Sequence, residues 1–313
     1  MAKNKNPAVR TGRLHSKKWE SYKLFLFVLP CLIFIFIFHY LPLWGWAYAF
    51  FQYVPGLSLQ DCEFVGLRNF TVLFGNAVMR DNLFRVLRNT FGLQLLNYLL
   101  MPVPMLFAIF LSEVASTKFQ KAVQTLTTLP HFISWVIMFS LASSLFGTNG
   151  IVNSVLGNAG LAKINILTTN QNVWLIQALL GLWKNMGWNA IIYFAAIAGL
   201  DQEVYEAAMV DGASRWQKIR YITIPLLIPT FFVLLIMGIG NFLNSGIDQF
   251  LVFGNAMNKE YIEMLDLYVY NLGIGSGQIS FSVAVGIMKS LVALVLFASA
   301  NFASKKVRGT SVF

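Results

Sequence analysis

The chain has 313 residues, of which 57% are hydrophobic and only 12% are charged. That charged share is about half of the share typical of soluble proteins, and a soluble fold of this length could not keep so much apolar surface from water. The composition therefore excludes an ordinary soluble domain and predicts an all-α, polytopic membrane protein. The net charge of +10 could indicate a nucleic acid partner, but the basic residues gather between apolar runs, which is typical of membrane topology instead.

Six apolar runs are long enough to cross a membrane as helices, since a span takes about 20 residues. The runs are residues 22–43, 87–111, 123–146, 173–200, 225–247 and 279–302. Fifteen of the 23 Lys and Arg residues fall on the amino-terminal side of this arrangement and six on the other side. Because Lys and Arg favour the cytoplasmic side, we predict six spans with both termini cytoplasmic.

The segments outside the spans complete the expected organisation. Residues 44–86 are amphipathic and aromatic, and we expect them to lie along the outer membrane surface before the second span. We expect basic cytoplasmic tails at residues 1–21 and 303–313, and a core of five spans at residues 87–302 that contains a cytoplasmic loop at residues 201–224.

Motifs for nucleotide and metal chemistry do not occur in the sequence. There is no Gly-x-x-x-x-Gly-Lys-Ser/Thr loop, no His-Glu-x-x-His and no Cys-x-x-Cys. The histidines His15, His39 and His131 are scattered, and Cys31 and Cys62 lie in different segments. We therefore predict a chain that is not an enzyme by itself and binds neither a metal nor a cofactor.

The loop before the fifth expected span is far more acidic than the other inner segments. Its acidic residues are Asp201, Glu203, Glu206 and Asp211. Gly212 can take the left-handed conformation that ends a helix. Ala213 and Ser214 would begin a second short helix that carries Trp216, and Pro225 suits the first turn of the next span. On physical grounds alone the loop could also be an ordinary amphipathic connector, since periodicity cannot name a partner.

Residues Glu206-Ala207-Ala208, then Gly212, then Ile222-x-Ile224-Pro225 follow a long, position-rich spacing. The spacing resembles the signature of binding-protein-dependent importer permeases of the ABC transporter superfamily: Glu-Ala-Ala, three residues, Gly, nine residues, Ile-x-Leu-Pro. Only Ile224 departs from it, and the apolar volume is kept. In that family the segment is a coupling helix that docks on the ATPase subunit. The resemblance implies a docking site made of Glu203, Glu206, Ala207, Ala208, Asp211, Gly212, Ala213 and Trp216.

The resemblance extends from about residue 82 to the carboxyl end, as a type I permease core of five spans preceded by one extra span. It is similar to the carbohydrate-importing, maltose-importer branch. The front of the chain, through Phe38-His-Tyr-Leu-Pro-Leu-Trp-Gly45, Ala49-Phe50 and Phe64-Val-Gly-Leu-Arg-Asn-Phe70, resembles its polysaccharide and lipoprotein permease subgroup.

The same resemblance implies the partners and the location. The expected partners are a second homologous permease in a heterodimer, two ATP-binding cassette subunits that hold ATP and Mg, an extracytoplasmic solute-binding protein, membrane lipid and a sugar, with no nucleic acid. The expected location is the bacterial inner membrane, and the expected mechanism is alternating access.

Amides and aromatic faces suit a sugar path, and two expected spans offer them. The fourth span carries Asn185, Trp188 and Asn189; the fifth carries Asn241 and Asn244, which are three apart and would share a helix face. Polar residues at membrane depth usually face the interior or a cavity. In maltose-type permeases the sugar contacts lie on these two spans, and the resemblance implies that Asn185, Trp188, Asn241 and Asn244 fall at or near them. We predict a substrate path along these four residues and Asn189. The alternative is hydrogen bonding between neighbouring helices.

Lys184 and Lys289 lie within expected spans, where a charged side chain is a functional hypothesis by default. One interpretation is contact with an anionic sugar such as a uronate. We favour the other, in which the lysines snorkel or pair with a buried acid such as Asp248 or an acid in the partner.

Two other functional classes fit the sequence less well. An ion-coupled secondary transporter of small polar solutes would show buried acids or broken helices near the midplane, and the spans contain almost no Asp or Glu. A membrane-embedded enzyme would need paired acids or a His cluster. We therefore predict the permease subunit of an ATP-driven sugar importer, with an oligosaccharide as substrate.

Overall fold

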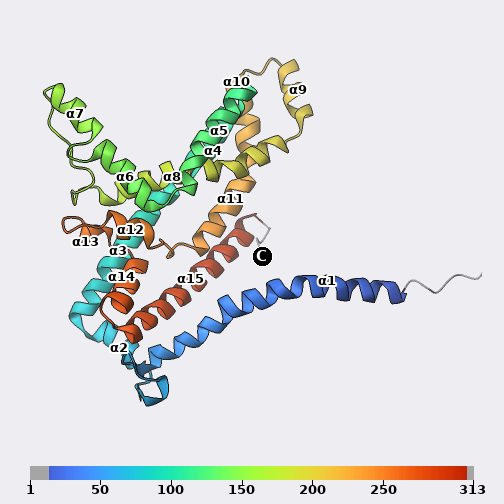
Figure 1. Cartoon of the computed structure of the whole chain (residues 1–313). Helices are drawn as coiled ribbons and strands as arrows, with labels where there is room; N and C mark the ends of the chain where they lie inside the picture. Colours follow the sequence, from blue (N-terminus) through green and yellow to red (C-terminus); the bar gives the residue numbers. More distant parts are fainter. Residues whose placement is uncertain (1–13, 309–313) are drawn as a thin grey trace, which may run out of the picture.

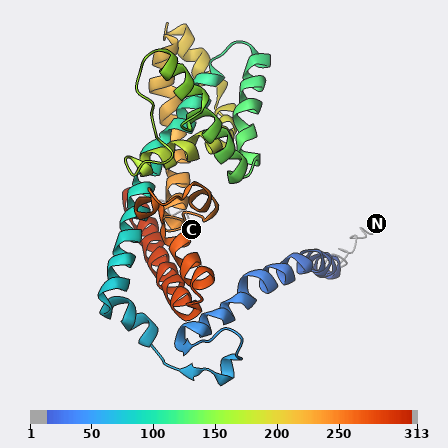
Figure 2. The same cartoon turned by 60° about the vertical axis from the view of Figure 1, so that its left-hand side comes forward.

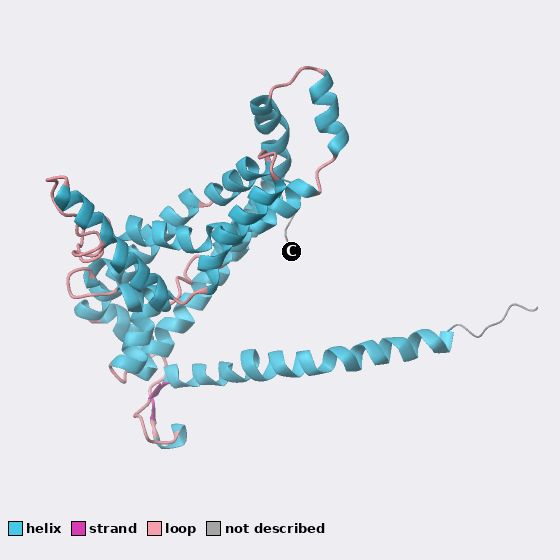
Figure 3. Ribbon diagram, turned by 45° about the horizontal axis from the view of Figure 1, so that its top comes forward, coloured by secondary structure: helices cyan, strands magenta, loops and turns pink. Residues whose placement is uncertain are grey.

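The computed structural model describes the backbone of residues 14–308 and the side chains of residues 22–302. The tails expected at residues 1–21 and 303–313 therefore lie outside the described side chains. The described part of the chain is mostly helical, as predicted, with loops between the helices (Figure 3). It also contains an antiparallel pair of two-residue strands, β1 (Phe51–Gln52) and β2 (Glu63–Phe64).

The amino-terminal helix α1 (Leu14–Ile35) passes through a π-helical turn, η1 (Phe36–Tyr40), into the 3-10 helix η2 (Leu41–Phe50). It runs away from the body of the molecule (Figures 1 and 2). Its described apolar side chains, such as Phe27 and Phe34, are exposed in this chain. A helix that is apolar on every side needs lipid or another protein around it, so α1 is a membrane element that packs little on its own chain.

The next part of the chain builds the bundle, and local signals start its helices. Asn76 accepts from two backbone amides at the start of α3, Pro102 opens α4, and Ser116 and Ser134 cap α5 and α6. The elements are η3 (Leu59–Asp61), α2 (Arg68–Gly75), α3 (Ala77–Leu100), α4 (Pro102–Ser112), α5 (Thr117–Phe132), α6 (Trp135–Phe146), α7 (Ile151–Asn158) and α8 (Val173–Ala198).

Two expected spans differ in the structure. The helix predicted over residues 123–146 is two helices, because Ile133 and Ser134 are extended and Ser134 caps α6. The helix predicted over residues 225–247 ends at Gly240. The remaining elements are α9 (Gln202–Val210), α10 (Arg215–Lys218), η4 (Ile219–Thr223), α11 (Ile224–Gly240), α12 (Asp248–Phe253), α13 (Lys259–Ile262), α14 (Leu265–Tyr270), η5 (Asn271–Gly275) and α15 (Ile279–Arg308).

Five helical stretches of the described chain are long and apolar enough to cross a membrane. They are Tyr22–Phe50, Ala77–Ser112, Trp135–Asn158, Arg215–Gly240 and Ile279–Phe302. The helix α8, expected as the fourth span, has the length but not the apolar composition, because amides and Lys184 interrupt it. The count of six spans therefore stays a prediction.

Helix α8 lies at the centre of the bundle and packs against α3, α4, α5 and α11. Toward its start, Ala178 and Leu180 belong to a buried cluster with Phe250 and Met264, and toward its end Tyr193 is buried with α4. In Figure 1, α9 and the described end of α15 lie to the right of α2 and α7.

Helices α5 and α8 approach each other closely at Gly187. A Cβ atom at this position would lie 2.4 Å from the backbone C and O of Thr127. Backbone atoms cannot move aside as a flexible side chain does, so the two helices can meet here only where the residue is Gly.

We predict that Gly187→Ala lowers the thermal unfolding midpoint of the purified permease in detergent, because overpacking a tight contact costs roughly 1–3 kcal/mol. The matched control is Gly286→Ala in α15, where an added Cβ meets nothing within 4 Å. There the better helix propensity of Ala should leave the midpoint unchanged or raise it. Equal midpoints for the two variants would contradict the close approach.

Candidate functional site

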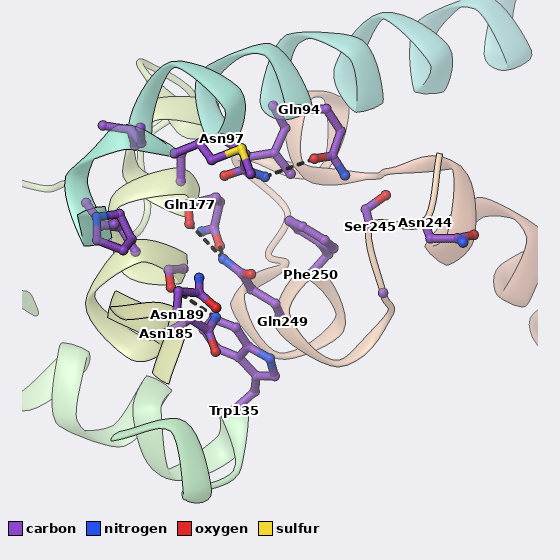
Figure 4. A pocket seen from close by; sticks show the side chains of 18 of the residues that line it. Gln94, Asn97, Trp135, Gln177, Asn185, Asn189, Asn244, Ser245, Gln249 and Phe250 are labelled. Atoms are coloured by element: carbon purple, nitrogen blue, oxygen red, sulfur yellow. Dashed lines mark hydrogen bonds between the residues drawn. The ribbon is translucent and has the colours of Figure 1, made fainter. Parts of the chain in front are cut away.

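A polar cavity of about 600 Å³ lies between α3, α4, α8 and the segment that follows α11 (Figure 4). Seven of the residues that line it carry carboxamides, and the one charged side chain among them is Asp248. The carboxamide residues are Gln94, Asn97, Gln177, Asn185, Asn189, Asn244 and Gln249. Each carboxamide can both donate and accept hydrogen bonds, so the wall is suited to a polar ligand with several hydrogen-bonding groups.

A polar stripe along α8 forms one side of the cavity. Gln177, Gly181, Asn185, Asn189 and Tyr193 all line it and are spaced four residues apart. Residues at this spacing lie one above the other on a helix, and sixteen residues of helix rise about 24 Å. The stripe thus follows the helix for most of the thickness of a bilayer core, and it explains why α8 is less apolar than the other long helices.

The opposite walls come from three other segments, and the side chains are already bonded to one another (Figure 4). In α3, the Asn97 amide donates to Gln94 Oε1 at 3.2 Å. After α11, the Gln249 amide donates to both the carbonyl and the Oε1 atom of Gln177 at 2.9 Å. Trp135, at the start of α6, adds an aromatic face.

Two hydroxyl groups of the wall have no hydrogen-bond partner. Tyr193 OH and Ser245 Oγ are buried and are the unsatisfied buried side-chain polar atoms found in the described part of the chain. Buried hydroxyls in native proteins are normally bonded to protein or to ordered water. Their place in this cavity wall is therefore typical of a site that a polar ligand or water completes.

Three of the five residues predicted for the substrate path, Asn185, Asn189 and Asn244, line the cavity. Trp188 does not; its ring stacks on His131, with ring centroids 4.4 Å apart. Asn241 does not line it either. It follows the end of α11, so the helix face expected for Asn241 and Asn244 is wrong, although the Asn244 amide donates to Asn241 Oδ1 at 3.1 Å.

The sequence interpretation missed four carboxamides of the wall. Gln94, Asn97 and Gln177 lie inside expected spans, and Gln249 lies in an outer segment. The signal for the first three was present, since the rule that singled out Asn185 applies to any amide within an apolar run.

Lys184 neither snorkels nor pairs with an acid. The residue is 7% exposed, and its Nζ atom donates to the carbonyls of Pro130, His131 and Ile133 at 2.9, 2.8 and 2.6 Å. The last carbonyls of a helix have no partner within it, and a cation at that end is favourable. Lys184 therefore caps the end of α5, and its three donors are used within the chain.

Lys289 pairs with an acid, in agreement with the interpretation that we favoured from the sequence. The acid is Asp266 and not Asp248. Asp248 instead lines the cavity. Among the residues described, no group of three or more His, Cys, Asp or Glu side chains could hold a metal ion.

The loop at residues 201–224, which is predicted to dock on the ATPase, folds as two short helices around a glycine turn. Gly212 has φ +75°, and the Ala213 amide donates to the Ala208 carbonyl while the Gly212 amide donates to that of Met209. This pair of bonds is the Schellman motif, which needs the left-handed residue that Gly supplies. Ser214 and Gln217 then form a reciprocal capping box at the start of α10.

The residues predicted to dock on the ATPase share this one surface. Most of them are exposed, and Ala208 and Ala213 are half-buried against the turn. Apolar side chains next to them are also exposed, including Val210 at 88% and Trp216 at 58%. Helix α9 has no buried residue and stands away from the bundle (Figure 1). An apolar surface of this kind at the end of a span is typical of a contact with another protein.

Comparison with known proteins gives the class of this molecule. A family described as the binding-protein-dependent transport system inner membrane component matches residues 100–309. Protein LplB of Bacillus subtilis (strain 168) is 37% identical over 302 residues, covering 96% of this chain and 92% of LplB. The polygalacturonan/rhamnogalacturonan transport system permease protein YteP of the same organism is 40% identical over 296 residues, covering 94% of this chain and 91% of YteP.

Comparison with solved structures gives the same class of protein. A bacterial ABC transporter involved in the import of the acidic polysaccharide alginate matches with a TM-score of 0.82 and 33% sequence identity, over 95% of this chain and 99% of that chain. A bacterial alginate ABC transporter in complex with alginate pentasaccharide-bound periplasmic protein matches with the same TM-score and identity.

The chain therefore belongs to the family of binding-protein-dependent transport system inner membrane components. It is a permease subunit of an ABC importer, a transport component and not an enzyme in itself. Membership in this family implies ATPase and binding-protein partners, and it favours this class over the ion-coupled secondary transporter.

We predict that Gly212→Pro leaves the permease in the membrane but lowers uptake at least tenfold relative to ATP hydrolysis. Pro fixes φ near −65°, whereas Gly212 has φ +75°, so the turn between α9 and α10 cannot form. Uptake and hydrolysis would be measured on the complete complex in proteoliposomes. The matched control is Gly160→Pro, which changes a glycine at φ +70° in the loop after α7. Wild-type uptake by Gly212→Pro would disprove the docking site.

Proposed function

We propose that the chain forms one half of the pathway of an importer that carries oligosaccharides, including acidic ones with uronate units, from a solute-binding protein into the cytoplasm. The observation that carries this proposal is the carboxamide-lined cavity with its two unpartnered hydroxyls. YteP is named for polygalacturonan and rhamnogalacturonan transport, and the matching solved transporter imports alginate, which supports an acidic sugar chain.

The chemistry of the cavity suits a sugar in two ways. Sugar hydroxyls donate and accept hydrogen bonds, and so do the carboxamides of Asn189 and Gln249. The Asn185 side chain is already bonded to the His131 ring and to the Gly181 carbonyl, so it joins α8 to α5 at the edge of the cavity. Trp135 supplies a flat face on which the apolar side of a sugar ring can lie, whereas Phe250 is 1% exposed and packs in the core behind the wall. A uronate carboxylate would accept from the amide NH₂ groups, since the cavity residues of this chain include no Lys or Arg.

The partners follow from what the chain leaves exposed. The coupling surface of α9 and α10 would dock on one of two ATP-binding cassette subunits, which hold ATP and Mg. The exposed α1 and the cavity would be completed by a second, different permease. The distribution of Lys and Arg supports an inner-membrane location with both termini cytoplasmic.

The mechanism we propose is alternating access. Closure of the ATPases would displace α10, and η4 and α11 would carry the displacement toward the segment after Gly240, which forms part of the cavity wall. A hydrogen bond between Tyr205 OH and Thr223 Oγ1 at 2.9 Å joins α9 to the base of α11. The displacement would turn the cavity from one side of the membrane to the other.

We predict that Asn189→Leu lowers oligosaccharide uptake about tenfold at unchanged ATPase docking, because one or two hydrogen bonds worth about 0.5–1.5 kcal/mol each are lost. The measurement is uptake of labelled trigalacturonate and of a neutral trisaccharide by the complete complex in proteoliposomes. Asn158→Leu makes the same change at an exposed position of α7 outside the cavity and should retain uptake.

Two results would count against the proposal. Unchanged uptake in Asn189→Leu would remove this cavity from the pathway. Failure of the wild-type complex to take up any sugar in a panel of neutral and acidic oligosaccharides would reject the sugar as substrate.

A further inference from the structure

The carboxylate of Asp266 joins three parts of the chain. Asp266 stands in the first turn of α14, and its Oδ2 atom accepts from the backbone amides of Ser245 and Gly246 at 2.8 and 3.1 Å. Its other oxygen, Oδ1, forms an ion pair with Lys289 of α15. The side chains of both residues are only 16% exposed. Hydrogen bonds to an ionised group are about twice as strong as neutral ones, so this is a firm attachment.

The segment that Asp266 holds is a wall of the cavity. Asn244, Ser245 and Gly246 all line it, and Ser245 carries one of the two unpartnered hydroxyls. Behind this wall lies a second hollow of about 660 Å³, which is lined by Asn244, Asp266 and Lys289 among others. The ion pair therefore backs the cavity wall without lining the cavity.

The same segment is where the coupling span ends. The chain runs from α10 through η4 into α11, which is helical to Gly240, and the wall begins four residues later. A helix transmits a displacement along its length, whereas a free loop would absorb it. Whether a displacement of α11 moves residues 244–246 therefore depends on the contacts that hold these residues at the end away from α11.

We infer that Asp266, held by Lys289, is a clamp that fixes residues 244–246 against α15, so that displacement of α11 reshapes the cavity instead of being lost in a loose loop. Asp266 and Lys289 are positioning residues: they act on the sugar through the wall. The inference rests on the proposed transport function and adds a residue to it that the sequence pattern did not single out.

The described chain contains a second, partly buried ion pair that joins helices away from the cavity and can serve as a control for stability. Arg85 Nη2 lies 2.6 Å from Glu263 Oε2, and the Asn271 amide donates to Glu263 Oε1 at 2.8 Å. This pair ties α3 to the segment before α14, and neither residue lines the cavity. Glu263→Gln is thus the matched control for Asp266→Asn, since both substitutions leave a partly buried cation unpaired.

The first experiment compares uptake of labelled trigalacturonate with ATP hydrolysis by the complete complex in proteoliposomes. We expect Asp266→Asn and Lys289→Met to lower uptake at least tenfold while hydrolysis stays within twofold of wild type, and Lys289→Arg to retain uptake. The control Glu263→Gln should lower uptake, hydrolysis and yield by equal factors. If Asp266→Asn shows the same equal fall, or if it keeps wild-type uptake, the clamp is overturned. If the wild-type complex takes up no sugar, the proposed function fails and not the clamp.

The second experiment reads the wall directly and does not depend on transport. In a Cys31→Ser, Cys62→Ser background, Ser245→Cys places a thiol where the native hydroxyl is buried. We expect slow labelling by a maleimide, at least tenfold faster labelling when Asp266→Asn is added, and no acceleration with Glu263→Gln. Equal labelling rates with and without Asp266→Asn would show that the wall is held by other contacts and would overturn the inference.

Discussion

The structure depends on one constraint: a polar stripe on α8 has to be kept away from lipid. Polar side chains in a membrane are costly unless they face protein or a cavity. Helix α8 therefore lies at the centre, with α3, α4, α5 and α11 around it. Gly187 lets α5 come into backbone contact, and Lys184 bonds to the carbonyls that are exposed where α5 ends. Lys184 thus stabilises the break between α5 and α6, and Trp135 lines the cavity at the start of α6.

The coupling segment could be predicted from sequence almost residue by residue, because its conformation is set locally. The left-handed turn needs Gly212, and the start of α10 needs a side chain such as Ser214 that can cap a helix. Those requirements appear in the sequence as a fixed spacing. The partner of the segment could not be predicted in this way, since exposure and charge do not name a protein. Family membership implies ATPase and binding-protein partners, and docking of this segment on the ATPase stays a prediction.

The cavity could be predicted only in part, because its walls are brought together by tertiary contacts. Asn185 and Asn189 of α8 were found, since they interrupt an apolar run, whereas Gln177 of the same helix was missed. Gln249 was not, because its bond to Gln177 joins residues that are far apart in sequence. The end of α11 was also missed: residues 241–247 read as apolar enough to continue a helix, yet Asp266 binds the amides of Ser245 and Gly246 in a non-helical turn. No local pattern shows such a bond.

The charges around the cavity suit a site that binds a sugar weakly and releases it, more than a site that holds the sugar tightly. An ammonium group facing a uronate in a low-dielectric site would hold it strongly, and a carrier must also release what it binds. In this chain, the lysines near the cavity are already engaged, Lys184 by carbonyls and Lys289 by Asp266. The wall itself offers amides, hydroxyls and the single carboxylate of Asp248. For the acidic oligosaccharides proposed above, such a wall gives many weak, exchangeable hydrogen bonds to hydroxyls and carboxylates. In the proposed function, the sugar would move along the stripe of α8 without having to break an ion pair at each step.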